Sequence, residues 1–568
     1  MSEKKTKKSS DNAATGEYSE IYSQKLDVEN IDKKMKKTFL LAHGVVIGVF
    51  LALIIFIVGQ QNSSEDSKEY IGGNIIRLAN GIGEPADNYV VGNPWKNASL
   101  LGMLTMRSLF LTDSTYTEIN ERLAEKYEVL DDGCTYVITM RENQFWSDGE
   151  EITVEDVVFS FHAFMSCDDV NSNMSAAFNH IVGATEYAEG KADSITGITS
   201  EGNTVTIQID EPYSTFALML TQFVPVPEHV LKDEDWTTLT QDHDFFTSDH
   251  IVCSGQYVVG GLDEEKNMIL VHNPYYTDTL SDIETILFCW DYENTELDYY
   301  PTNDITKMVS YRSMKGYEEH EVSVYYYRYF VFNLAGGDEG EENSAMQDVR
   351  VRQAINHAID VETLLKDVYL DKGEQVYGGS IGHAEEVYDY DPEKAKALLE
   401  EADYDFSRTF VISYYSGDSN SRIFLERVKA YLEAVGLTVE LYKAGSGELY
   451  ENPNYDMMMK NLSSLNTEDW YSEYLSTNAN LGQLLGREGE FDDLVSQLTS
   501  TPDIKEYNSI LQELVDLEQG LLYKMPMFLI GEAVYINGNR LSVPDDMVFG
   551  NTRYRSDVRL DEWFVIKE

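Results

Sequence analysis

The sequence predicts an α/β protein that lies outside the cell and is attached to the membrane by one N-terminal helix. Three observations lead to this prediction: a long apolar run near the N-terminus, short alternating strands in the first half, and alternating helices and strands in the second half. The chain has 568 residues, of which 43% are hydrophobic and 12% aromatic. It is long enough for several packed domains, and its composition is not that of a disordered protein.

The membrane segment is predicted at residues 38–59, TFLLAHGVVIGVFLALIIFIVG, which carry no formal charge. A helix of this length spans a hydrocarbon core of about 30 Å. The basic run KKMKK precedes it and acidic residues follow it, so the N-terminus is expected in the cytoplasm. We therefore expect a disordered cytoplasmic tail at 1–37, a single-pass anchor at 38–59 and a linker at 60–73, with the rest of the chain on the extracellular side.

An uncleaved anchor is favoured over a cleaved signal peptide. Residues 58–61, VGQQ, form a poor cleavage site, and the apolar run is longer than that of an ordinary signal peptide. No cysteine follows the run, which excludes lipid attachment there.

The charge balance excludes several classes of partner. The chain has 43 Lys and Arg against 99 Asp and Glu, a formal net charge of -56, so nucleic acid is not an expected partner. The acidity indicates a solvated surface, with attraction of cationic ligands as the alternative. No spacing typical of a metal site and no cofactor motif occurs, and the four cysteines are expected to be free thiols, with one bridge as the alternative.

The first half of the outer region predicts strands and one well-marked helix. Segments 74–81, 134–140 and 203–209 alternate apolar and polar residues and adjoin turn pairs such as Asn-Gly. Between the last two strands, Asp148-Gly149 predicts a hairpin turn, and Thr153 with Asp156 resembles a capping box that begins a helix.

The second half predicts a βαβ unit. Residues 409–417 and 437–445 alternate like strands, the segment between them has helical spacing, and Gly436 stands where a helix C-terminal glycine is expected. Further helices are predicted at 348–370 and at 391–404, the latter capped by Asp391 and opened by Pro392.

Successive segments of this region resemble motifs of the extracellular solute-binding proteins of family 5, which serve oligopeptide, dipeptide and nickel importers of the ABC type. They include VLDDGCTYVITMRENQFWSDGEEITVEDVVFSF, SGQYVVGGLDEEKNMILVHNPYY, YRYFVFNLAGG, QDVRVRQAINHAID and YDPEKAKALLEEA, in the family's order from about residue 74 to residue 536. A transmembrane anchor departs from the usual form of the family.

The resemblance implies a two-lobed fold like that of periplasmic binding proteins, of the large type with an extra α+β domain on the first lobe. Lobe I is expected at 74–107, 194–324 and 525–568, its extra domain at 108–193 and lobe II at 325–524. Hinge closure around the ligand would present the closed form to permease subunits, so no catalytic residue is expected.

The resemblance also implies where the ligand is held. The loop after the first strand would contribute Asn80, Gly81, Gly83 and Glu84, and a segment of lobe II would contribute Leu462, Ser463, Ser464, Leu465, Asn466, Glu468, Asp469 and Trp470. Peptide binders of the family have a Gly-Trp pair and an ammonium-binding aspartate in this segment. Here Asn461 and Leu462 replace the pair and Leu465 replaces the aspartate, so either Glu468 or Asp469 takes over its role or the ligand lacks a free amino terminus.

The function that follows is the substrate-binding subunit of an ABC importer, with an oligopeptide as cargo. An oligosaccharide is the alternative cargo, because the 38 Tyr, 23 Phe and 6 Trp of the chain could line a cleft with flat amphipathic surfaces suited to sugars. A surface glycan hydrolase or a ligand sensor are the alternatives from other classes.

Overall fold

The computed structural model describes residues 74–566 except for 80–92, 97, 131–132, 239–243, 248–250, 291–295, 324–325, 336–343, 381–382, 446–447, 452–453, 479, 486–488, 502 and 551–553. These residues belong to one compact unit, 73–568. The expected tail, anchor and linker at 1–73 lie outside the described residues. Within the described ranges, no helix is long and apolar enough to cross a membrane.

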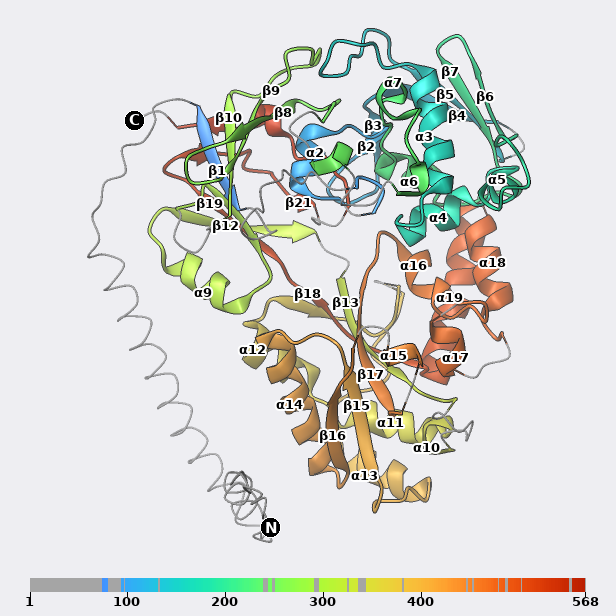
Figure 1. Cartoon of the computed structure of the whole chain (residues 1–568). Coiled ribbons are helices and arrows are strands. Elements are labelled where there is room, and N and C mark those ends of the chain that lie inside the picture. The colour runs from blue at the N-terminus through green and yellow to red at the C-terminus, as the bar shows by residue number, and fades with distance from the viewer. Residues whose placement is uncertain are drawn as a thin grey trace, which may run out of the picture. The chain divides into compact units, whose positions relative to one another are not determined.

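Lobe I is built on an eight-stranded mixed sheet in the order β21-β12-β19-β11-β1-β10-β9-β8 (Figure 1). The central strand β1 is parallel to both of its neighbours, and its alternating residues Ile76 and Leu78 are buried, which confirms the strand expected at 74–81. The strands are β1 (Ile75–Ala79), β8 (Tyr257–Leu262), β9 (Met268–His272), β10 (Thr285–Cys289), β11 (Tyr299–Thr302), β12 (Tyr317–Ser323), β19 (Ala533–Asn537) and β21 (Phe549–Gly550).

Lobe II is built on a six-stranded sheet in the order β14-β18-β13-β17-β15-β16 (Figure 1). The expected βαβ unit is confirmed, since β15 and β16 are parallel and joined by α14 (Ser419–Ala434). Gly436 follows the end of α14 with φ of +103°, a conformation that L side chains rarely adopt. The strands are β13 (Tyr326–Phe332), β14 (Gly373–Gln375), β15 (Thr409–Tyr414), β16 (Thr438–Lys443), β17 (Met457–Ser463) and β18 (Lys524–Ile530).

The accessory domain, as we name the part around the four-stranded sheet β4-β5-β7-β6, carries the expected capping box. The Thr153 hydroxyl accepts from the backbone of Asp156, whose carboxylate accepts from the Thr153 N–H, and α3 (Val154–Ser166) begins there. Gly149 has φ of +95° in the turn before it, which confirms the hairpin. The strands are β4 (Ala124–Val129), β5 (Thr135–Met140), β6 (Ile198–Glu201) and β7 (Thr204–Gln208).

Helices cover these sheets. Lobe I and the accessory domain have α2 (Leu100–Thr105), α4 (Ser172–Phe178), α5 (Ala184–Ala188), α6 (Phe216–Gln222), α7 (Glu228–Leu231) and α9 (Ile305–Ser313). Lobe II has α11 (Val349–His357), α12 (Val361–Tyr369), α13 (Pro392–Glu401), α16 (Thr467–Ser472), α17 (Leu481–Leu485), α18 (Asp492–Ser500) and α19 (Ile504–Leu521). The helix expected at 348–370 is divided in two, because Asp360 caps a new helix start, whereas Asp391 and Pro392 open α13 as expected.

Three strands belong to other sheets than the ones in which we expected them. Strand β7, which we expected in lobe I, pairs with β5 of the accessory domain, and β6, also expected in lobe I, pairs with β7. Strand β18, which we also expected in lobe I, pairs with β13 and β14 in lobe II. The hydrogen-bonded partner of each strand decides to which sheet it belongs. The alternation of apolar and polar residues predicts a strand but not its partner.

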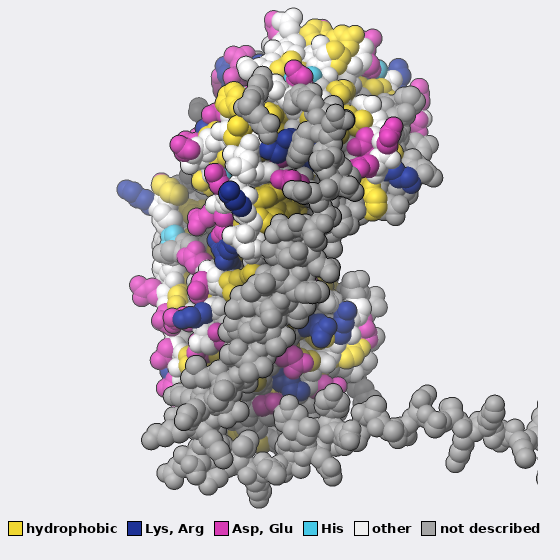
Figure 2. Space-filling model, turned by 90° about the vertical axis from the view of Figure 1, so that its left-hand side faces the viewer, with side chains coloured by type: hydrophobic (Ala, Val, Ile, Leu, Met, Phe, Trp, Pro, Cys, Tyr) yellow, Lys and Arg dark blue, Asp and Glu magenta, His cyan; other side chains and the backbone are white. Residues whose placement is uncertain are grey.

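The chain passes between the two lobes twice, from β12 to β13 and from β18 to β19. Each lobe has its own apolar core. All four cysteines, Cys134, Cys167, Cys253 and Cys289, are free thiols. On the face drawn in Figure 2, acidic side chains are interspersed with basic and apolar ones rather than gathered in one patch.

Candidate functional site

The candidate site lies where the end of β17 and the start of α16 in lobe II meet lobe I. Asn466 caps α16 because its side chain accepts from the backbone N–H of Asp469 at 3.0 Å. The Asp469 carboxylate in turn accepts from the N–H of Leu465 at 2.7 Å. These local bonds fix the loop, and they direct both carboxyl groups of the first helical turn, those of Glu468 and Asp469, toward lobe I.

Four hydrogen bonds join the lobes around this loop. In the first two, Asn173 of α4 donates to Asp469 Oδ2 at 2.9 Å, and the Ser214 hydroxyl donates to Glu468 Oε1 at 3.0 Å. The others run from the Ser214 N–H to the carbonyl oxygen of Thr499 at 2.7 Å, and from the Tyr554 hydroxyl to the carbonyl oxygen of Ser463 at 2.7 Å.

Leu465 strengthens the same contact through packing. It is 3% exposed and belongs to the apolar core of lobe I, although it follows a strand of lobe II. Burying a leucine side chain contributes about 1.5–3 kcal/mol. The structure therefore shows the lobes in contact at the segment where the sequence predicted the ligand.

Neither carboxylate has a cationic partner in the described part of the chain. Glu468 is buried and Asp469 half-buried, and both accept hydrogen bonds from neutral groups. Burial raises the pKa of Glu468, and burial together with repulsion from Glu468 and Glu473 raises the pKa of Asp469 to about 7. Two adjacent acids with raised pKa values and no cation favour a positively charged ligand group.

Trp470 does not line this contact. Its ring is fully buried in the core of lobe II, between Tyr327 and Tyr329, and its indole N–H donates to Glu518 at 2.6 Å. The ammonium of Lys524 lies 3.6 Å from the ring centroid. In this conformation the residue is a core side chain, so the expected ligand contact is not seen there.

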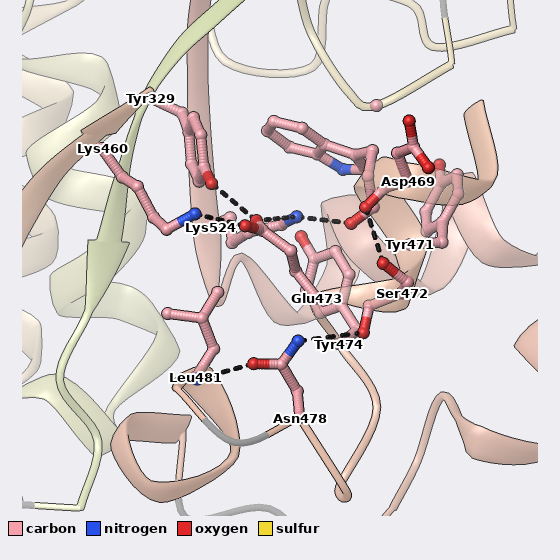
Figure 3. A network of polar contacts seen from close by, with 12 residues as sticks. Tyr329, Lys460, Asp469, Tyr471, Ser472, Glu473, Tyr474, Asn478, Leu481 and Lys524 are labelled. Carbon is pink, nitrogen blue, oxygen red and sulfur yellow. Dashed lines mark hydrogen bonds and ion pairs between the residues drawn. The ribbon is translucent and has the colours of Figure 1, made fainter. Parts of the chain in front are cut away.

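A buried polar network supports α16 from behind (Figure 3). Glu473 accepts from Lys460, from Lys524 at 3.2 Å and from the Tyr329 hydroxyl at 2.6 Å. These two lysines hold the pKa of Glu473 down to about 2, despite its burial. Glu473 is thus a paired structural charge, unlike the two acids one turn earlier in the helix.

The remaining expected residues are placed as follows. Leu462 and Ser463 end β17 opposite Tyr327 and Tyr326 of β13, and the Ser464 hydroxyl donates to the carbonyl oxygen of Asn466. Asn80, Gly81, Gly83 and Glu84 lie outside the described residues. Within those residues no group of side chains is arranged to hold a metal ion.

Sequence reasoning missed the lobe I partners of this loop. Asn173, Ser214 and Tyr554 are between about 90 and 300 positions away from the residues that they contact. Asn173 and Ser214 stand near helix starts, a position typical of capping residues, so nothing in the sequence distinguishes them as contact residues.

The architecture of a cleft-type binding protein is two lobes linked by two chain crossings, and here two carboxyl groups without a cationic partner among the described residues lie where the lobes meet. The chain belongs to the bacterial extracellular solute-binding proteins, family 5, whose family model matches residues 118–483. Members of this family are binding proteins rather than enzymes, and they work with ABC permeases.

Curated relatives agree with the family. The chain is 23% identical over 482 residues to the Escherichia coli protein named "Probable deoxycholate-binding periplasmic protein YgiS", covering 77% of this chain and 85% of that one. It is 25% identical over 369 residues to the Dipeptide-binding protein of Escherichia coli, covering 58% of this chain and 64% of the relative.

Solved structures share the fold. NikA from Brucella suis in complex with Fe(III)-EDTA aligns with a TM-score of 0.70 at 15% identity, covering 87% of this chain and 100% of that one. Lactococcal OppA complexed with an endogenous peptide aligns with a TM-score of 0.65 at 17% identity, with the same coverage. The two-lobed periplasmic-binding-protein fold is therefore confirmed.

Proposed function

We propose that this chain captures peptides in the cleft between its lobes and delivers them to an ABC permease. The observation that carries the proposal is the pair Glu468 and Asp469, two largely buried carboxyl groups at the lobe contact that have no cationic partner among the described residues. A peptide α-ammonium supplies the missing charge, and Asp469, the more exposed of the two, is the group that binds it.

In this proposal Asp469 takes over the role of the ammonium-binding aspartate that the family has and this chain lacks. Leu465 occupies the place of the family's aspartate, and its backbone N–H donates to the carboxylate of Asp469 four residues later. The binding carboxylate is thus shifted along α16 and remains at the end of β17. Asn80, Gly81, Gly83 and Glu84, which follow β1, form the opposite side of the peptide site in this proposal.

The cargo is peptide rather than oligosaccharide. The relatives named for peptides favour this assignment, and no relative reported above is named for a sugar. Deoxycholate, after which YgiS is named, has no ammonium group and would leave both acids unpaired.

Thermal denaturation of the full chain in detergent tests the proposal. A ligand that binds the folded state raises the melting temperature by mass action. We expect a tripeptide library with free amino termini to raise it, the same library acetylated at the amino terminus to have little effect, and D469N to lose the difference. Equal shifts from free and acetylated libraries would argue against the ammonium site, and a shift with glycans or deoxycholate alone would reassign the cargo.

We also propose that residues 38–59 tether the protein to the cell membrane, with the two lobes on the extracellular side. The support is the length and charge-free composition of that segment. The expected result is a membrane-bound protein that resists carbonate extraction and is released when residues 1–59 are deleted. Release of the full chain by carbonate would refute the tether.

A further inference from the structure

Lobe II contains a cavity that is separate from its contact with lobe I. The volume of the cavity is about 160 Å³. A water molecule needs about 10–15 Å³ of such space, so the cavity is large enough for a small organic molecule. Its walls come from segments 356–362, 375–377, 386–390 and 518–526, which all belong to lobe II.

The strand register places this cavity toward the end of the lobe II sheet that is remote from lobe I. Ser463, at the lobe contact, pairs with Tyr326 of β13. Lys524, which lines the cavity, pairs with Val331 of the same strand. The chain from residue 326 to residue 331 extends about 17 Å in an antiparallel strand. The cavity is therefore distinct from the peptide site proposed above.

The lining of the cavity is aromatic and apolar. Tyr377 follows β14, and Tyr388 and Tyr390 precede α13. Val387 and Tyr390 are 49% and 46% exposed, so the cavity opens to solvent beside them. The other apolar residues of the lining are Ile359, Val361, Val376, Leu522 and Pro526.

Three carboxyl groups lie beside these tyrosines. Asp360, Glu362 and Glu386 line the cavity, and none of them forms an ion pair within the described part of the chain. Burial raises the pKa of Tyr377, and repulsion from Glu386 and Glu362 raises it further. Burial and repulsion from Asp360 raise the pKa of Tyr390 in the same way. Each of these two rings therefore has a carboxylate nearby.

The lysine of the lining does not neutralise these acids. Lys524 is fully buried, and its ammonium donates to Glu473 at 3.2 Å and to the carbonyl oxygen of Trp470 at 2.7 Å. Glu518, the remaining acid of the lining, accepts from the indole N–H of Trp470 and from three further donors. The cavity therefore retains the negative charge of three uncompensated carboxylates.

Hydrogen bonds to α19 hold the aromatic walls in position. The Gln519 side chain donates to the carbonyl oxygens of Tyr377 and Glu385 at 3.2 and 2.8 Å. The Tyr388 hydroxyl donates to the carbonyl oxygen of Gln519 at 2.6 Å, and its ring packs edge-on against His357. A site that is formed before the ligand arrives loses less conformational entropy on binding.

Aromatic rings beside carboxylates attract organic ammonium ions, because the ring faces and the acids are both negative. A primary ammonium group needs hydrogen-bond partners, whereas methyl groups on the nitrogen pack against apolar walls. We propose that this cavity is a second ligand site, which binds a small molecule with a methylated ammonium head. The inference goes beyond the proposed function and does not depend on it.

The test measures binding of choline chloride to the full chain in detergent, by calorimetry and by the rise in melting temperature. Two compounds separate the charge from the methyl groups. One is the alcohol in which a carbon atom replaces the nitrogen of choline, and the other is ethanolamine. A cation–π contact strengthens binding by about two- to fivefold, and several such contacts combine here. We expect choline to bind about fivefold or more tightly than the uncharged alcohol, and more tightly than ethanolamine.

Variants locate the site. Y377L and E386Q should each weaken choline binding by about two- to fivefold. E385Q is the matched control, because Glu385 is adjacent and equally exposed but does not line the cavity, and it should leave choline binding unchanged. D469N should also leave choline binding unchanged, so this site and the peptide site are tested independently.

Equal binding of choline and the uncharged alcohol would overturn the cation site, and so would an equal rise in melting temperature with sodium chloride. Ethanolamine that binds as tightly as choline would overturn the assignment to a methylated head. Loss of choline binding in D469N but not in E386Q would move the cation to the lobe contact and refute the cavity as its site. The comparison of the compounds on the wild-type protein decides the question even if Y377L does not fold.

Discussion

Trp470 and Glu518 are joined by a 2.6 Å hydrogen bond from the indole N–H to Oε1, which ties α16 to α19 across 48 residues of chain. The same carboxylate accepts from the hydroxyls of Tyr471 and Tyr474 and from the backbone N–H of Gly379, each at 3.0 Å. Four donors thus converge on one buried acid. Glu518 therefore anchors the helix that carries the candidate ammonium site, in addition to the network around Glu473.

Replacing this acid tests the anchor. E518Q keeps the size of the side chain but turns one acceptor into a donor that faces other donors, so we expect a loss of about 2–4 kcal/mol in the free energy of unfolding. Urea denaturation of the full chain in detergent measures it. Glu513, exposed on the same helix, gives the control E513Q, for which a change of less than about 0.5 kcal/mol is expected. Equal effects of the two variants would contradict the anchoring role.

The network around Glu518 also shows what the sequence could and could not predict. Features set by neighbouring residues were predictable: the Thr153 capping box, the βαβ unit at 409–443 and the start of α13 at Pro392 all agree with the structure. The role of Trp470 was not predictable, because its partner is distant in the sequence and an aromatic residue beside acidic ones is equally typical of a binding site. Pairing decided the place of β18 for the same reason.

The resemblance led us to expect ligand contacts from segment 462–470, and in the structure this segment meets lobe I through partners from three distant segments. Asn173, Ser214 and Tyr554 meet the loop only once both lobes have folded. Local patterns carry no information on such contacts.

Asp469 predicts a pH dependence of stability. Its pKa is raised to about 7 in the folded protein from an ordinary value of 3.8, so the folded state holds a proton that the unfolded state has lost between these values. Stability should therefore fall as the pH rises from about 4 to about 7. We expect D469N to weaken this dependence and D493N, a change at an exposed aspartate, to leave it intact, with melting temperatures measured from pH 5 to pH 8. An unchanged pH profile in D469N would contradict the raised pKa.

The hydrogen bond from the Tyr554 hydroxyl to lobe II should stabilise the contact between the lobes. Y554F removes the bond to the carbonyl oxygen of Ser463, worth about 0.5–1.5 kcal/mol, without changing the buried ring. We expect faster hydrogen exchange at residues 464–472 in Y554F. The control Y275F, at a tyrosine that is 45% exposed, should leave that segment unchanged. Equal exchange in both variants would mean that this bond does not hold the contact.

Two glycines should respond to alanine in opposite directions. Gly531 lies in the second crossing between the lobes, and a Cβ there would stand 2.9 Å from the Lys372 carbonyl carbon and 3.0 Å from the Gly373 nitrogen, both backbone atoms. Because backbone cannot move aside easily, we expect G531A to cost about 1–3 kcal/mol. Gly520 lies inside α19 with nothing within 4 Å of a new Cβ, so G520A should stabilise the protein by about 0.5–1 kcal/mol through its higher helix propensity. Urea denaturation decides both. If G531A left the free energy of unfolding unchanged, the backbone around this crossing would have to be less tightly packed than these distances imply.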